Sequence, residues 1–191
     1  MGKLTEIANN LGTDKGTNAF CKHSYTLTYE ELFDPLLTQH VKMLEIGVAD
    51  PRFPGASVKM WKDYFPQCTF VGYDINEQAL QFAQEGASIF IGDQNKPEDL
   101  QRLISEHGSD WDIIVDDGSH HGEHVVTSFD NLFEHVKPGG YYIIEDLHAV
   151  YMNAPKMIAD VKAIIEKKNH PVSEFFQRNN DKLLIIRKAP K

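Results

Sequence analysis

The sequence predicts an α/β fold built on a mostly parallel sheet that ends in an antiparallel hairpin. Short β-rich apolar runs alternate with longer amphipathic segments, the order expected of parallel strands joined by crossover helices. Near the end of the chain, two β-rich runs within residues 173–188 are separated by Asn179, Asn180 and Asp181, residues typical of a hairpin turn. With 191 residues, 41% of them hydrophobic, the chain suits one compact domain.

Five apolar runs are the predicted parallel strands, and each carries an acidic residue near its carboxyl end. They are residues 42–48, 69–75, 87–93, 112–118 and 141–147. A sheet closed by a hairpin differs from the usual dinucleotide-binding halves, which continue in βαβ units. The acidic residue repeated at the strand ends is the main indication of function.

Five amphipathic segments are the predicted helices that follow or connect these strands. They are residues 57–64, 77–85, 97–107, 123–136 and 154–168. Ser57, Asn76 and Asn95 stand where helix N-caps belong. The sequence KPGG at 137–140 is expected to end the fourth helix before a strand begins.

Residues 1–40 are expected to form an N-terminal helical segment that precedes the main part of the domain, residues 41–191. One helix is predicted near residues 4–11 and a second near residues 28–39, with the polar sequence GTDKGT between them. We expect this segment to pack across the carboxyl edge of the sheet as a lid. The residues that would then face cofactor or acceptor are Thr13, Asp14, Lys15, His23 and Tyr25.

Composition narrows the class of partner and the location of the protein. The formal net charge of -9 opposes a role on nucleic acid, since such proteins carry basic patches. No apolar run approaches the roughly 20 residues that span a bilayer, and residues 1–10 do not resemble a signal peptide. Cys21 and Cys68 fit neither a disulfide framework nor a metal-binding spacing. We therefore expect a cytoplasmic protein without a membrane or nucleic-acid partner.

The acidic strand ends should share one cleft, because ligands of open α/β sheets bind outside the carboxyl ends of the strands. Glu45 and Gly47 follow the first strand, where a carboxylate can bind an amine and a glycine allows close approach of a ligand. Asp74 is placed to accept ribose hydroxyls, and Asp93 with Gln94 to contact an adenine edge. For any single acid, a loop or helix-cap role is the competing interpretation.

The first turn reads EIGVADPRFPGAS and lacks the G-x-G-x-x-G spacing that brings a pyrophosphate onto a helix N-terminus. A ligand without phosphates is preferred over NAD.

The sequences EIG, GYDI, GDQ and DIIVDDGSHH resemble the motifs of class I S-adenosylmethionine-dependent methyltransferases. This resemblance implies a Rossmann-like methyltransferase sheet and S-adenosyl-L-methionine as cofactor, near Glu45, Gly47, Asp74, Ile75, Asp93, Gln94 and Asp116.

Four longer strings, GTDKGT, MWKDYFP, DDGSHH and KPGGYYIIEDLH, resemble the metal-dependent sugar O-methyltransferases of the macrolide-antibiotic type. The resemblance covers nearly the whole chain. It implies that Asp117, Glu145 and Asp146 are metal ligands and that His120 is the base. His121 and His148 are candidates for a supporting role, since imidazole also ligates metals.

The residues themselves agree with this assignment. Three carboxylates from the ends of two neighbouring strands would make a hard, oxygen-rich site suited to Mg²⁺ or another divalent cation. The competing interpretation is helix capping or charge compensation by nearby lysines.

The expected function is transfer of a methyl group to a hydroxyl of a small-molecule or glycoside acceptor, such as a sugar or other vicinal diol, in natural-product, antibiotic or glycan modification. Two alternatives stay open. One is a metal-independent small-molecule methyltransferase, and the other is a non-catalytic S-adenosylmethionine-binding module. Trp61, Tyr64 and Phe65 suit either a core or the interface of a homo-oligomer.

Overall fold

A computed structural model describes residues 2–18, 23–84 and 86–191. Its sheet has seven strands in the order β3-β2-β1-β4-β5-β7-β6. The strands β1 to β5 are parallel, and β7 runs antiparallel between β5 and β6. The strands are β1 (Val41–Ile46), β2 (Cys68–Asp74), β3 (Ala87–Ile91), β4 (Trp111–Asp116), β5 (Val136–Ile144), β6 (Val172–Arg178) and β7 (Leu183–Lys188). The predicted fold class, including the terminal hairpin, is confirmed.

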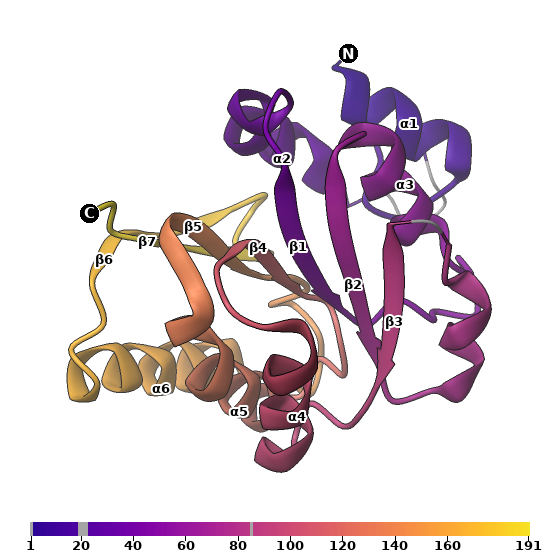
Figure 1. Ribbon diagram of the computed structural model, residues 1–191. Helices are drawn as coiled ribbons and strands as arrows, with labels where there is room; N and C mark the ends of the chain where they lie inside the picture. Colours follow the sequence, from indigo (N-terminus) through magenta and orange to yellow (C-terminus); the bar gives the residue numbers. More distant parts are fainter. Residues whose placement is uncertain (1, 19–22, 85) are drawn as a thin grey trace.

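Six α-helices of the described residues cover the two faces of the sheet (Figure 1). They are α1 (Lys3–Leu11), α2 (Tyr25–Phe33), α3 (Ala56–Tyr64), α4 (Pro97–His107), α5 (Gly122–Leu132) and α6 (Ala154–Lys167). Short 3₁₀ segments are η1 (Asp34–Leu36), η2 (Glu77–Phe82) and η3 (Phe133–His135). Figure 1 shows α1, α2 and α3 gathered on one side and α4, α5 and α6 on the other.

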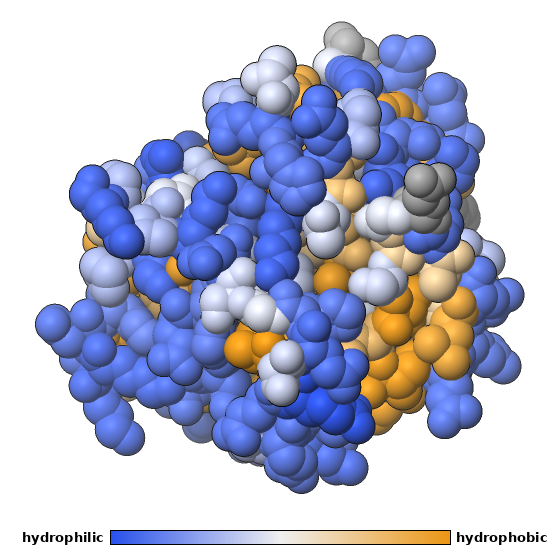
Figure 2. Space-filling model, in the orientation of Figure 1, coloured by the Kyte–Doolittle hydropathy of each residue, from blue (hydrophilic) through white to orange (hydrophobic). Residues whose placement is uncertain are grey.

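The core is divided between these faces by the alternation of side chains along each strand. Met43 and Ile113 pack into the cluster that contains α1, α2 and α3, whereas Leu44 and Ile114 pack into the cluster of α4, α5 and α6. The aromatic residues that suited either core or interface are all in the first cluster and buried: Trp61, Tyr64 and Phe65. Figure 2 shows further apolar side chains gathered on the surface over the edge strand β3.

Several predicted element boundaries were wrong for identifiable reasons. Of the predicted helix 77–85, residues 77–82 form the 3₁₀ turn η2, and the chain then enters the edge strand through an isolated bridge between Gln84 and Ala87. The second N-terminal helix starts at Tyr25 and gives way to η1, which contains Pro35. KPGG lies inside β5, because Val136 already pairs with β4 and a register shift accommodates the segment.

The predicted N-caps were correct only at Asn76, whose side chain accepts from the Gln78 amide. Ser57 lies inside α3 and its hydroxyl donates instead to the buried Glu45 carboxylate at 2.7 Å. The N-cap position of α4 is held by Lys96, one residue after the predicted Asn95, and no side-chain hydrogen bond caps this helix.

Cys68 is a buried free thiol, and Cys21 lies outside the described residues. None of the helices in residues 2–18, 23–84 and 86–191 combines the length and apolar character that a bilayer crossing needs. The strand order reverses between β1 and β4, which places a cleft for ligands beyond the carboxyl ends of these two strands.

Candidate active site

A cavity of about 600 Å³ opens at the carboxyl ends of β1 to β4. Its volume falls within the roughly 300–1,000 Å³ of small-molecule and cofactor sites. The sequence-predicted residues that line it are Thr13, Asp14, Lys15, Gly47, Asp74, Ile75, Asp93, Gln94, Asp117, His120 and Asp146. Those that do not contribute to its lining are His23, Tyr25, Glu45, Asp116, His121, Glu145 and His148.

The loop after β1 is fixed by a glycine and by an acid from the next strand. Gly47 has a φ of 87°, and a Cβ there would overlap the backbone of Asp117. Asp74 Oδ2 accepts from the amides of Val48 and Ala49, both at 2.9 Å. The carboxylate predicted to accept ribose hydroxyls therefore also holds the loop that forms the cavity wall.

A buried polar network lies beneath the third and fourth strand ends. Gln94 donates to Asp116 Oδ1 at 3.0 Å and accepts from the Ser119 amide at 2.7 Å. Ser128 donates to Asp116 Oδ2 at 2.5 Å. Burial raises the pKa of Asp116. Asp116 thus fixes the loop that carries the candidate base, from below the cavity rather than within it.

Lys15 stands among three carboxylates of the sheet, which with it form what we call the Lys15 cluster: Lys15, Glu45, Asp117 and Glu145. The ammonium contacts Asp117, lies 2.8 Å from Glu145 Oε2 and lies 3.7 Å from Glu45 Oε1. Lys15 is only 1% exposed, so its charge requires such partners. Burial alone would lower the pKa of Lys15, but Asp117 and Glu145 raise it well above its ordinary value.

Two members of this cluster face the core rather than the cavity. Glu145 Oε1 accepts from the Tyr29 hydroxyl at 2.5 Å, and burial raises the pKa of Glu145 to about 7. Glu45 accepts from Ser57 and from the Trp61 indole at 3.2 Å. Only Asp117 of the cluster's carboxylates therefore opens onto the cavity.

His120 and Asp146 complete the open side. His120 Nε2 lies 3.6 Å from Asp146 Oδ2 and 3.8 Å from Asp117 Oδ1. His120 and Asp146 both adopt the left-handed backbone region, with φ of 53° and 55°. Such conformations cost energy in non-glycine residues and cluster at functional sites. Burial lowers the pKa of His120, so its imidazole is neutral near pH 7 and able to accept a proton.

The side chains of Asp117, His120 and Asp146 could hold a divalent cation. One possible ligand atom from each lies within 4.8 Å of the others. Carboxylate oxygens suit Mg²⁺ and an imidazole suits several transition metals. Glu145, the remaining predicted ligand, has both of its oxygens already bonded, one to the Lys15 ammonium and one to the Tyr29 hydroxyl.

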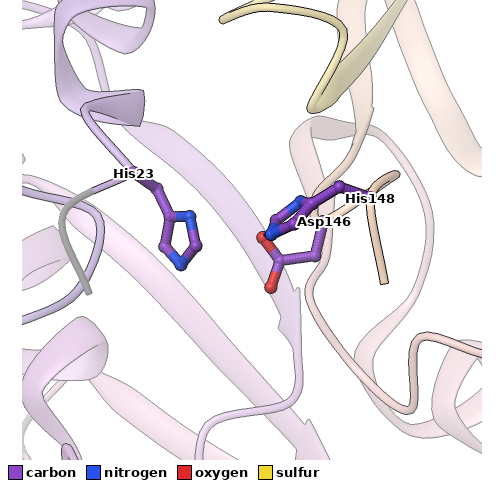
Figure 3. A group of neighbouring side chains, drawn as sticks. All are labelled: His23, Asp146 and His148. Atoms are coloured by element: carbon purple, nitrogen blue, oxygen red, sulfur yellow. The ribbon is translucent and has the colours of Figure 1, made fainter. Parts of the chain in front are cut away.

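A second such group consists of His23, Asp146 and His148 (Figure 3). The N-terminal segment supplies its first member, and Tyr25 from the same segment donates to Asp146 Oδ1 at 2.5 Å. His121 instead stacks on Tyr151, with ring centroids 4.8 Å apart, and both residues line a smaller, separate pocket.

The sequence reasoning missed some of the lining. Residues 50–53 after β1 form part of the wall, and so do Ser119 and His124. Asp50 in this loop forms an ion pair with Arg52 at 2.6 Å. The available signal was their place in the short segment between β4 and α5, since Ser119 and His120 precede that helix and His124 lies in its first turn.

Comparison with known proteins finds O-methyltransferases. The chain is 41% identical over 132 residues to demethylmacrocin O-methyltransferase of Streptomyces fradiae, a match that covers 68% of this chain and 33% of the relative. Mycinamicin VI 2″-O-methyltransferase of Micromonospora griseorubida matches with the same identity and coverage. No family model matches the chain.

The fold also matches the MycE methyltransferase from the mycinamycin biosynthetic pathway, solved in complex with Mg and SAH. The TM-score is 0.82 at 30% identity, over 99% of this chain and 55% of that chain. A second MycE structure, which also contains mycinamycin VI, matches with a TM-score of 0.82 at 29% identity. The chain spans about a third of the length of the curated relatives it matches. It belongs to the class I S-adenosylmethionine-dependent methyltransferases, among which it is similar to the macrolide-sugar O-methyltransferases.

Proposed function

We propose that the chain is an O-methyltransferase that transfers a methyl group from S-adenosyl-L-methionine to a hydroxyl of a sugar or other vicinal diol, with a divalent metal such as Mg²⁺. The observation that carries this proposal is the convergence of His120, Asp117 and Asp146 on one wall of the cavity. The acceptor would be a small molecule or glycoside used in natural-product or glycan modification. We retain the expectation of a cytoplasmic enzyme that does not act on nucleic acid.

The cofactor would occupy the part of the cavity bounded by the first three strand ends. Gly47 lets the loop after β1 lie close against the backbone of Asp117 and form part of the lining, and Asp93 offers a carboxylate to the same cavity. Ile75 lines the cavity and is 69% exposed. A cofactor ring bound there would remove this apolar side chain from water, which favours binding.

His120 would be the general base. Asp117 and Asp146 would hold the metal, which leaves the neutral imidazole of His120 free to take the proton of the acceptor hydroxyl. When bound, S-adenosyl-L-methionine supplies an electrophilic methyl group and the metal supplies Lewis acidity that lowers the pKa of the hydroxyl. The rigid strand ends contribute by fixing the orientation of the base.

The test is a methyl-transfer assay with glycosides that carry adjacent free hydroxyls. His120→Ala should abolish turnover while the affinity for S-adenosyl-L-methionine, measured by calorimetry, stays nearly unchanged. Asp117→Asn should raise the Mg²⁺ concentration needed for activity. His135→Ala is the matched control, because His135 directly precedes the first residue of β5 and so lies at the amino-terminal end of that strand, away from the carboxyl ends that form the cavity.

One observation favours a second candidate, a metal-independent methyltransferase. The Lys15 ammonium already compensates part of the acidic charge beside the cavity, as a bound cation would. Full activity in excess chelator would select this candidate and exclude the metal. Cofactor binding without transfer to any of the glycosides would instead indicate a binding module.

A further inference from the structure

We propose that His23, Asp146 and His148 form a second metal site, which binds an imidazole-preferring divalent ion such as Zn²⁺ or Co²⁺. One possible ligand atom from each residue lies within 4.8 Å of the others. Figure 3 shows the three side chains facing one another, His23 from the segment before α2 and the other two from the turn after β5. This group differs from the oxygen-rich group in the proposed catalytic site, although it shares Asp146 with it.

The imidazole of His23 is held in place but lacks one partner. Its ring stacks on Tyr25, with centroids 5.0 Å apart and planes at 17°. Its Nε2 lies 4.0 Å from Asp14 Oδ2, so a carboxylate stands near one ring nitrogen. Its Nδ1 is buried and has no hydrogen-bond partner among the described residues. A buried polar atom of this kind requires a partner, and a metal ion would supply one.

The other two ligands approach from the sheet. His148 Nδ1 lies 4.0 Å from Asp146 Oδ1, and the His148 ring centroid lies 5.5 Å from that of His23. The Tyr25 hydroxyl donates to the same Asp146 oxygen at 2.5 Å, which orients the carboxylate. Contacts of this kind, which orient a ligating side chain, strengthen metal sites. The His148 side chain is 46% exposed, so an ion can reach the group from solvent.

The donor set determines the class of metal. Two imidazoles with one carboxylate favour Zn²⁺, Co²⁺ or Ni²⁺ over Mg²⁺, which prefers oxygen ligands. The charges around His23 are mixed. Asp14 and Asp146 attract a cation, whereas the positive charge of Lys182 repels one. Asp146 offers Oδ1 towards His148 and Oδ2 towards His120. Because the two sites share Asp146, a metal ion bound at the second site would change the charge and position of this carboxylate at the first.

The experiment is a Co²⁺ titration of the whole metal-free protein in excess Mg²⁺, followed by the visible absorption of the bound ion. Excess Mg²⁺ competes for the carboxylate-rich first group, so Co²⁺ should favour the group with two imidazoles. Wild type should bind one Co²⁺ at this site, and His23→Ala and His148→Ala should each bind it at least about tenfold more weakly. The matched control is His40→Ala, which removes an exposed histidine that contacts Thr69 Oγ1. This control should leave Co²⁺ binding unchanged.

Two results would overturn the proposal. One is equal Co²⁺ affinity in His148→Ala and His40→Ala. The other is loss of Co²⁺ binding in His120→Ala but not in His148→Ala, which would place the ion on the first group. Circular dichroism of each variant checks the fold, and the exposed position of His148 makes it the variant that disturbs packing least. The readout does not depend on methyl transfer, so failure of the proposed function would leave it intact.

Discussion

Replacement of Lys15 by methionine should destabilise the fold strongly. The substitution keeps a long apolar stem but removes the ammonium that Asp117, Glu145 and Glu45 surround. Removal of one partner of a buried ion pair typically costs about 3–5 kcal/mol, because the remaining charges stay buried without compensation. Lys15 and Glu145 are both 1% exposed, so this range applies here rather than the smaller one for surface pairs.

Urea unfolding measures this cost. With a slope of about 2 kcal/mol per molar urea, a loss of about 4 kcal/mol would lower the midpoint by about 2 M. The matched control is Lys59→Met, which removes an exposed pair with Asp63 at 2.7 Å and should cost at most about 0.5 kcal/mol. The Lys15→Met cost should also shrink as pH falls, since protonated carboxyls need no cation. Equal midpoints for the two variants would refute the reasoning.

Three further predictions concern a carboxyl, a thiol and a glycine. In metal-free protein, the pKa of Glu145 is raised from 4.5 to about 7, so its contribution to stability is full below pH 4.5 and is lost as pH rises through 7. Glu145→Gln should therefore flatten the fall in unfolding free energy over that range, and an unchanged slope would contradict the assignment. Burial raises the pKa of Cys68 to about 12, so in a Cys21→Ser background a thiol reagent should react at pH 8 only after unfolding; rapid labelling of the native protein would argue against this. Gly47→Ala should weaken S-adenosyl-L-methionine binding measured by calorimetry, because its Cβ would overlap the Asp117 carbonyl, and wild-type affinity would show that the loop can shift.

The strand ends could be predicted from the sequence because their pattern is local. Each acidic residue follows a short apolar run, and the parallel arrangement then brings Asp74, Asp93 and Asp117 to one edge. The hairpin was predictable for the same reason, since its turn residues lie between two β-rich runs. Patterns of this kind need no knowledge of distant contacts.

The division of the acids between cavity and core could not be predicted in this way. Glu145 and Asp146 are adjacent in the sequence, yet only Asp146 lines the cavity. Tyr29 and Lys15 bind Glu145 from the N-terminal segment, and no local pattern reveals that pairing. The boundary errors at 77–85 and 137–140 have a similar origin, because pairing within the sheet overrode the local preference.

The contacts that hold the acids in place have a consequence for the order of folding. Lys15 and Glu145 are separated by 130 residues, Tyr25 and Asp146 by 121, and Tyr29 and Glu145 by 116. Contacts so distant in sequence carry a large loop-closure cost and are expected to form after the local ones. Lys15, Tyr25 and Tyr29 are therefore expected to reach their final positions only after the strand that leads into Glu145 and Asp146 has paired.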